Sequence, residues 1–334
     1  MQLSITTPIN KERNQGIQLL RAVAATLVVV QHVIWYSLEH FKIDPISVVN
    51  KYHLGSMGVG IFFVISGFVI TLSLHQNKMF LLFRMLRIYP PFWFLVIISF
   101  CFVKDITLTI DSFLLLPNKN FNSSYRIPYW TLVYEMFFYS FMYVFILFKI
   151  SKERLLQIMV FWILIIVIYN MIKEVYTPAP YLRIFFSPIN IFFIFGVCIA
   201  LNKEMYTKIP NYQLILVTII GFQFLQLTNG TLYHTVQALA CSAILLLFLK
   251  IEKIPQFFIT MGNSSYGLYL IHDLGIIGVI HLIKKYDVAI KLYPLCLLTF
   301  ILSMIVGVIY GYVEYKFHQN LVKWVKQTII NKRS

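Results

Sequence analysis

Two ionisable side chains, one of them able to act as a base, stand on the first apolar segment of the chain. Arg21 and His32 are eleven positions apart. In an α-helix, eleven residues return to within about 20° of the starting direction and advance about 16 Å, so the two residues share one face at different depths. An imidazole ionises near neutral pH and can take a proton from a hydroxyl group. The alternative is structural: a histidine bonded to a carbonyl, and an arginine that extends to the nearest polar surface.

Two further groups of polar residues lie in apolar surroundings. Glu135 stands among aromatic residues in the segment 130–139, near the expected outer surface. It could orient His32 or Arg21, bind sugar hydroxyls beside aromatic rings, or be an ordinary interfacial carboxylate. The segment 262–272 contains Tyr266 and ends at His272, with an aspartate next to it. His272 either lines the same cavity as His32 or makes a structural hydrogen bond.

Arg84 and Arg87 are three residues apart and directly precede a Tyr-Pro-Pro sequence. This spacing places both guanidinium groups on one side of a helix. Arginine binds phosphate oxygens in pairs, so the two residues suit a cofactor with several phosphates and an acyl cargo, such as an acyl-coenzyme A. Ordinary anchoring of positive charge at the cytoplasmic membrane surface is the alternative. The glycine-rich segment 58–68 favours close approach between helices.

The elements that carry these residues are predicted to be membrane helices. Of the 334 residues, 59% are hydrophobic and only 12% are charged, which excludes an ordinary soluble domain. Apolar runs recur along the whole chain, separated by polar or proline-containing breaks. We therefore expect an all-α integral membrane protein with about ten spans, at residues 17–37, 59–74, 89–103, 129–148, 155–172, 184–201, 214–227, 236–249, 266–283 and 295–312.

The basic residues predict that both termini are cytoplasmic. Of the 28 lysines and arginines, seventeen fall on the side that the termini share, ten fall on the opposite side, and Arg21 lies inside a span. Lysine and arginine are retained on the cytoplasmic side of short loops. The net charge of +15 is accordingly expected to face anionic membrane lipid, and no nucleic-acid partner is expected. The four cysteines fall in or beside apolar runs and are expected to be packing residues.

Taken together, these motifs resemble the membrane-bound acyltransferase 3 family over nearly the whole chain. Its Arg-x10-His corresponds to Arg21 and His32, and its FFxxSGF segment to Phe62 through Phe68. Its RxxR before Tyr-Pro corresponds to Arg84, Arg87, Tyr89 and Pro90. The segments 130–139 and 265–272 also look like its later motifs. The branch that acetylates bacterial exopolysaccharide is the most similar.

The resemblance implies a transmembrane O-acyltransferase of the bacterial inner membrane. Acetyl-CoA or another acyl-CoA would bind from the cytosol at Arg84 and Arg87, with Tyr89 and Ser66 as further donor-binding residues. His32 would be the catalytic base, with Arg21 and Glu135 also catalytic and with His272 and Tyr266 as further candidates. The acceptor would be a surface polysaccharide or a polyprenol-linked sugar precursor, and no metal is expected.

We expect one membrane domain at residues 17–317, between a cytoplasmic tail at 1–16 and a basic cytoplasmic tail at 318–334. Two other functions are compatible with polar groups inside a helical bundle. One is a transporter or flippase for a lipid-linked sugar. The other is a non-catalytic subunit of a polysaccharide assembly complex. The cytoplasmic arginine pair beside a deep histidine favours the acyltransferase.

Overall fold

The protein is described by a computed structural model at residues 14–73, 79–102, 106, 109–118, 127–175 and 181–331. Within these ranges it consists of helices and has no β-strand. The elements are α1 (Gln15–His40), α2 (Ile46–Tyr52), α3 (Leu54–Leu72), α4 (Phe80–Phe102), α5 (Ile110–Phe113), α6 (Trp130–Leu147), α7 (Lys152–Ile172), a 3-10 helix η1 (Tyr181–Phe186), α8 (Asn190–Leu201), α9 (Lys203–Tyr206), α10 (Asn211–Leu225), α11 (Gly230–Leu249), α12 (Gln256–Lys285) and α13 (Leu292–Asn331).

Each predicted span overlaps a helix, and the spans 59–74 and 89–103 end just outside the described residues. In the described part of the chain, eight helices are long and apolar enough to cross a membrane: α1, α3, α4, α6, α7, α11, α12 and α13. The other two, α8 and α10, are apolar but have 12 and 15 residues. They are therefore about 18 and 22 Å long, which is less than the hydrocarbon core of about 30 Å. Most of the predicted N-terminal tail lies outside the described residues, and the segment predicted as a C-terminal tail is helical as far as Asn331.

Exposed apolar side chains cover the outer helices. Phe161 of α7 is 63% exposed, Ile220 of α10 is 45% exposed and Ile309 of α13 is 61% exposed. A soluble monomer rarely presents large continuous apolar surfaces to water, whereas lipid is a suitable solvent for them. These surfaces and the eight long apolar helices are those of a multi-pass membrane protein.

Hydrogen bonds at the two ends of the bundle show that α1 runs opposite to α3 and α11, as alternating spans require. At one end, the side chain of Asn14 donates to the carbonyl of Leu249 at 3.1 Å, so α1 begins where α11 ends. At the other end, the Tyr233 hydroxyl lies 3.0 Å from His53 Nδ1, so α11 begins where α3 begins. The contacts do not distinguish the two sides of a membrane, and the cytoplasmic position of the termini stays a prediction.

Helix α4 begins nine residues before the predicted span and continues through Pro90 and Pro91. Both prolines fall inside the predicted span 89–103, although proline has no N–H group and leaves the carbonyl four residues earlier unbonded. For Pro90 that carbonyl belongs to Leu86, and it accepts a hydrogen bond from His318 Nδ1 of α13 at 3.3 Å. The neighbouring helix thus satisfies the freed group, which is the usual reason that membrane helices tolerate proline.

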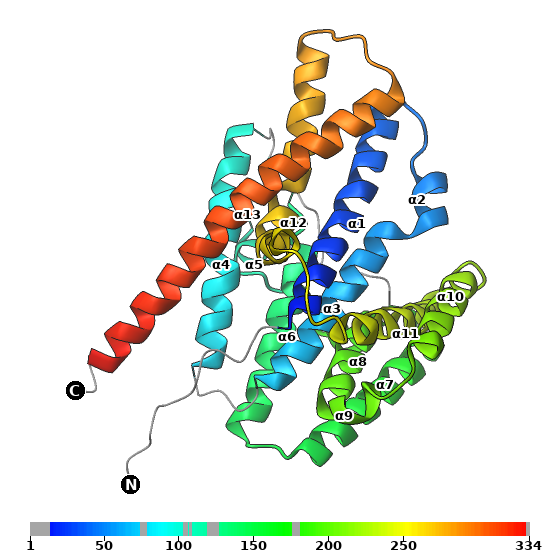
Figure 1. Cartoon of the computed structure of the whole chain (residues 1–334), viewed down its shortest axis with the longest axis vertical. Coiled ribbons are helices and arrows are strands. Elements are labelled where there is room, and N and C mark those ends of the chain that lie inside the picture. Colours follow the sequence, from blue (N-terminus) through cyan, green and yellow to red (C-terminus); the bar gives the residue numbers. More distant parts are fainter. Residues whose placement is uncertain are drawn as a thin grey trace.

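Helix α3 lies inside the bundle, and Figure 1 shows it beside α1, with α12 and α13 on one side and α8, α10 and α11 on the other. Its contact with α8 is especially close. A Cβ atom on Gly67 would lie 2.1 Å from the carbonyl oxygen of Phe193, and one on Gly196 would lie 2.1 Å from that of Val64. Glycine at both positions allows the two backbones to touch. The packing role predicted for the glycine-rich segment is therefore present at Gly67.

Candidate active site

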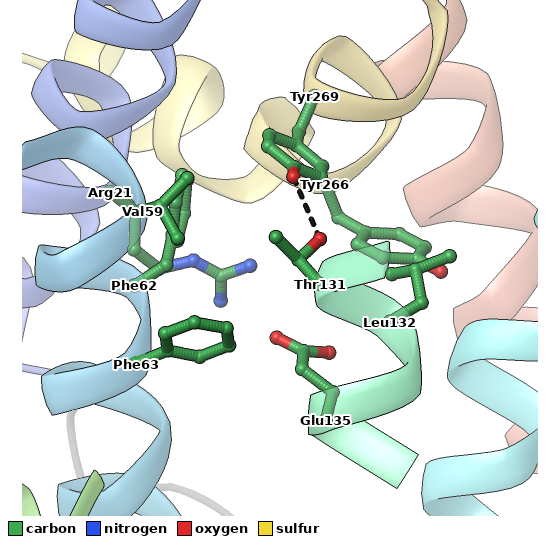
Figure 2. Close-up of a pocket in the computed structure, with 9 residues that line it drawn as sticks. All are labelled: Arg21, Val59, Phe62, Phe63, Thr131, Leu132, Glu135, Tyr266 and Tyr269. Atoms are coloured by element: carbon green, nitrogen blue, oxygen red, sulfur yellow. Dashed lines mark hydrogen bonds between the residues drawn. The ribbon is translucent and has the colours of Figure 1, made fainter. Parts of the chain in front are cut away.

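Four helices enclose a cavity of about 50 Å³ within the bundle (Figure 2). α1 and α3 line one side, α6 lines the opposite side, and α12 contributes two tyrosines at one end. The lining is mostly aromatic and aliphatic, with one positive and one negative side chain. The residues are Arg21, Val59, Phe62, Phe63, Thr131, Leu132, Glu135, Tyr266 and Tyr269.

The guanidinium of Arg21 and the carboxylate of Glu135 point into this cavity from opposite sides (Figure 2). Arg21 Nε donates to Ser265 Oγ of α12 at 3.2 Å. Glu135 accepts from Ser66 Oγ at 3.4 Å and from the Tyr139 hydroxyl at 3.2 Å. Ionisable groups are expensive in the membrane interior and are usually stabilised by each other and by such hydrogen bonds. Because Glu135 faces Arg21, the structure favours the role in which Glu135 orients the Arg21 side chain.

His32 does not line the cavity, although it shares a face of α1 with Arg21. Arg21 reaches Ser265 of α12, and His32 reaches His272 of the same helix. The two imidazoles are 3.2 Å apart between His32 Nδ1 and His272 Nε2, and their rings meet edge to face at 4.9 Å. His272 is fully buried, whereas His32 is half-buried.

Backbone carbonyls determine which nitrogen of each histidine carries the proton. His32 Nδ1 is 2.9 Å from the carbonyl oxygen of Val28, and His272 Nδ1 is 2.7 Å from that of Tyr269. A carbonyl can only accept a hydrogen bond, so both Nδ1 atoms are protonated. His32 shares its Nδ1 proton with His272 Nε2, which accepts it. In the neutral ring, the lone pair of His32 is therefore on Nε2, where a base needs it.

Asp273 completes this group and was noted in the sequence only as a neighbour of His272. Its Oδ1 atom is 3.4 Å from His272 Nε2. Ligand atoms of Asp273, His32 and His272 lie within 4.8 Å of one another, a separation that could hold a metal ion. With protons on both Nδ1 atoms, the histidines could offer a metal only their Nε2 atoms beside the Asp273 carboxylate, and His272 Nε2 already accepts from His32. We therefore interpret the group as a hydrogen-bonded histidine pair.

Arg84 and Arg87 lie on the same helix but contact different neighbours. The Arg84 guanidinium stands over the ring of Tyr139 in α6 at 5.3 Å. Arg87 forms an ion pair of 2.8 Å with Glu314 of α13 and stands over the ring of Tyr266 in α12 at 4.9 Å. Arg87 is thus held within the bundle by a nearly buried carboxylate. Among the described residues, no ion pair involves Arg84.

The remaining predicted residues divide between the cavity and its surroundings. Tyr266 lines the cavity and donates its hydroxyl to the carbonyl of Ile88 at 3.1 Å. Ser66 reaches the cavity through Glu135. Tyr89 is directed elsewhere, because its hydroxyl donates to the carbonyl of Leu114 at 2.7 Å in the connection between α4 and α6.

Sequence reasoning missed three residues that the structure brings to the site. Glu314 is an acidic residue just beyond the last predicted span, and the continuation of the helix past residue 312 would have been the signal for it. Thr131 and Tyr269 lie inside segments that were singled out, but their own side chains were not. Their hydroxyl oxygens are 2.7 Å apart at one end of the cavity. Nothing in a single sequence indicates that residues 138 positions apart form this bond.

Comparison with known proteins gives one result. A family model for an acyltransferase domain, that of the acyltransferase 3 family, matches residues 14–312, and this range contains all the residues of the site except Glu314. No significant match was found among curated proteins or among solved structures. The family match supports catalysis over the transporter and assembly-subunit alternatives. The chain therefore belongs to the membrane-bound acyltransferase 3 family and is a membrane acyltransferase.

Proposed function

We propose that the protein transfers an acetyl group from cytosolic acetyl-CoA to a hydroxyl of a bacterial surface polysaccharide or its polyprenol-linked precursor. The bacterial inner membrane is the proposed location. The observation that carries the proposal is the order of polar groups through the bundle. The arginines of α4 come first, followed by the cavity with Arg21 and Glu135, and then by the histidine pair.

Successive contacts support this order. Arg84 stands over Tyr139, whose hydroxyl bonds to Glu135 of the cavity. Arg87 stands over Tyr266, which lines the cavity itself. Further along α12, Tyr269 lines the cavity and accepts a hydrogen bond from His272 through its carbonyl. A donor whose phosphates lie at α4 would extend its thioester into the cavity.

The two arginines are suited to different parts of donor binding. Phosphate recognition needs guanidinium N–H groups that are not already committed to a carboxylate. Arg84 rests on aromatic faces, so its N–H groups are the better candidates to bind phosphate. Arg87 is paired with Glu314 and is better suited to fix the position of α4 against α13.

The chemistry requires a base for the acceptor hydroxyl. His32 Nε2 takes the hydroxyl proton while the oxygen attacks the thioester carbonyl carbon. The carbon–sulfur bond then breaks, and the departing thiolate recovers the proton from His32 Nε2. Arg21 supplies positive charge for the oxygen of the thioester carbonyl as negative charge develops there. The same Nε2 atom would carry the acyl group if transfer proceeded through an acyl-histidine.

The test compares producing cells that carry the wild type, His32→Ala or no copy of the protein, at matched membrane levels. The O-acetyl content of the surface polysaccharide is measured by NMR. We expect the ester signal to disappear in the deletion and in His32→Ala. His281→Ala serves as the control, because His281 is an exposed histidine on α12 away from the cavity and should leave acetylation unchanged.

Other outcomes would reject parts of the proposal. Acetylation that persists in His32→Ala but not in the deletion would remove His32 from the mechanism. Unchanged acetylation together with reduced polymer export in the deletion would favour a transporter.

A further inference from the structure

The donor cavity is closed on the side of the histidine pair by three residues from three helices. The Tyr269 hydroxyl lies 2.7 Å from Thr131 Oγ1 and 3.5 Å from the carbonyl oxygen of Pro128. Thr131 Oγ1 also donates to that carbonyl, at 3.1 Å. The ring of Phe62 meets the ring of Tyr269 edge to face at 5.9 Å. α3, α6 and α12 are joined at this point.

This closure lies at the end of the cavity that is nearer to His272. Phe62, Thr131 and Tyr269 line the cavity, whereas His32 and His272 do not. The ring of Tyr269 is 5.9 Å from that of His272, which lies one turn further along α12. Figure 2 shows the Thr131–Tyr269 bond at one end of the cavity and Glu135 at the other.

The size of the cavity limits what can occupy it. A water molecule needs about 10–15 Å³ of such space. The cavity of about 50 Å³ therefore holds roughly three to five atoms of that size. An acetyl group with its thioester sulfur has four heavy atoms, and each further methylene adds one. Longer chains would meet the rings of Phe62 and Tyr269.

We propose that Phe62, Thr131 and Tyr269 form the end wall of the acyl pocket and restrict the donor to acetyl-CoA. This inference rests on the proposed function and adds to it the length of the acyl group and the residues that select it. The hydroxyl pair keeps Tyr269 in place, because each hydroxyl has a second partner in the Pro128 carbonyl. Phe62 contributes the apolar surface that a longer chain would have to displace.

The experiment uses the full-length protein in membrane vesicles with open access to both sides. The acceptor is surface polysaccharide stripped of its esters by mild base. Acetyl-, propionyl- and butyryl-CoA are supplied in turn, and kcat/KM is obtained from ester formation measured by NMR. A hydrophobic pocket discriminates by about 10- to 200-fold per methylene. Butyryl has two more methylenes than acetyl, so we expect the wild type to prefer acetyl-CoA over butyryl-CoA by at least about a hundredfold.

Phe62→Ala should raise the butyryl-to-acetyl ratio of kcat/KM at least tenfold, because it removes the wall opposite Tyr269. Thr131→Ala breaks the hydroxyl pair and should raise the ratio in the same direction, so it carries the test if Phe62→Ala fails to fold. Phe141→Ala is the matched control. Phe141 packs against Trp162 of α7 at 4.6 Å between ring centroids and does not line the cavity, so the wild-type ratio should persist.

A wild type that uses butyryl-CoA as well as acetyl-CoA overturns this inference and leaves the proposed function intact. The inference is also overturned if Phe62→Ala and Thr131→Ala are active and keep the wild-type butyryl-to-acetyl ratio of kcat/KM. If the wild type forms no ester from any donor, the proposed function itself fails, and the end-wall role fails with it.

Discussion

At the scale of single residues, the position of one proton on His32 decides whether the ring can act as a base. The carbonyl of Val28 holds that proton on Nδ1, and His272 Nε2 accepts from the same atom. The two partners fix both the tautomer and the orientation of the ring, much as ligating histidines are oriented by their neighbours in metal sites. In the proposed mechanism His272 would be a positioning residue, because its hydrogen bond is made to His32.

Replacing His272 separates this positioning role from a general effect on folding. His272→Leu removes the acceptor at Nε2, and we expect kcat/KM to fall about 10- to 100-fold because a misplaced base loses its alignment. His272→Gln can offer a side-chain oxygen near the position of Nε2 and should restore part of the activity. The rates are measured with acetyl-CoA and base-treated polysaccharide, and thermal unfolding in detergent shows whether each variant is folded.

The prediction is tested by comparing kcat/KM of His272→Leu with that of His272→Gln. Equal loss in His272→Leu and His272→Gln, with unfolding temperatures like that of the wild type, would show that an acceptor at this position does not matter.

At the scale of the elements, the bundle depends on helices that approach to backbone contact. Lipid tails are as apolar as the side chains of the helices, so there is no hydrophobic driving force for one helix to pack against another. Close van der Waals packing therefore supplies much of the stability of the bundle. The α3–α8 crossing does so through Gly67 and Gly196. It also holds Phe62 and Ser66 of α3 in position, since both residues lie within about a turn and a half of Gly67.

Gly196→Ala should weaken this crossing. The added methyl group would lie 2.1 Å from the carbonyl oxygen of Val64 and 2.8 Å from the backbone nitrogen of Phe68, and neither atom can move without moving α3. Overpacking of this kind costs about 1–3 kcal/mol. We expect a lower unfolding temperature in detergent, measured by intrinsic tryptophan fluorescence.

Gly278→Ala on α12 is the matched control, because a Cβ atom there meets nothing within 4 Å. It should be neutral or slightly stabilising, since alanine favours helix more than glycine does. Similar destabilisation in both variants would mean that the α3–α8 approach is not limiting.

At the scale of the whole molecule, the alternating helices require that Arg84 and the end of α13 lie on the same side of the membrane. Lys326 of α13 stands over the ring of Phe83 of α4 at 5.3 Å, which joins the two ends directly. A cytosolic acyl donor therefore requires a cytoplasmic C-terminus, as the distribution of basic residues predicts.

Reporter fusions test this orientation. Alkaline phosphatase fused after Ser334 should be inactive, because the enzyme folds only outside the cytoplasm, and a fluorescent protein fused there should be bright. Phosphatase inserted at residues 286–291, between α12 and α13, should be active. Active phosphatase at the C-terminus would place Arg84 on the outer side and would exclude donor binding from the cytosol.

The sequence by itself determined the class of the protein, the order of its spans and the face that Arg21 shares with His32. These features depend on composition and on the regular geometry of a single helix, which holds in any packing. The family was accessible for the same reason, since its motifs are short and lie within single helices.

Only the tertiary structure decided which helices bring their polar groups together. It placed His272 against His32, Glu135 opposite Arg21 and Glu314 on Arg87, and it put Tyr269 in the cavity wall beside His272. In a soluble protein, the pattern of apolar and polar residues shows which face of a helix is buried. In lipid both faces are apolar, so a sequence carries little sign of which face meets which neighbour, and the contacts follow from packing alone.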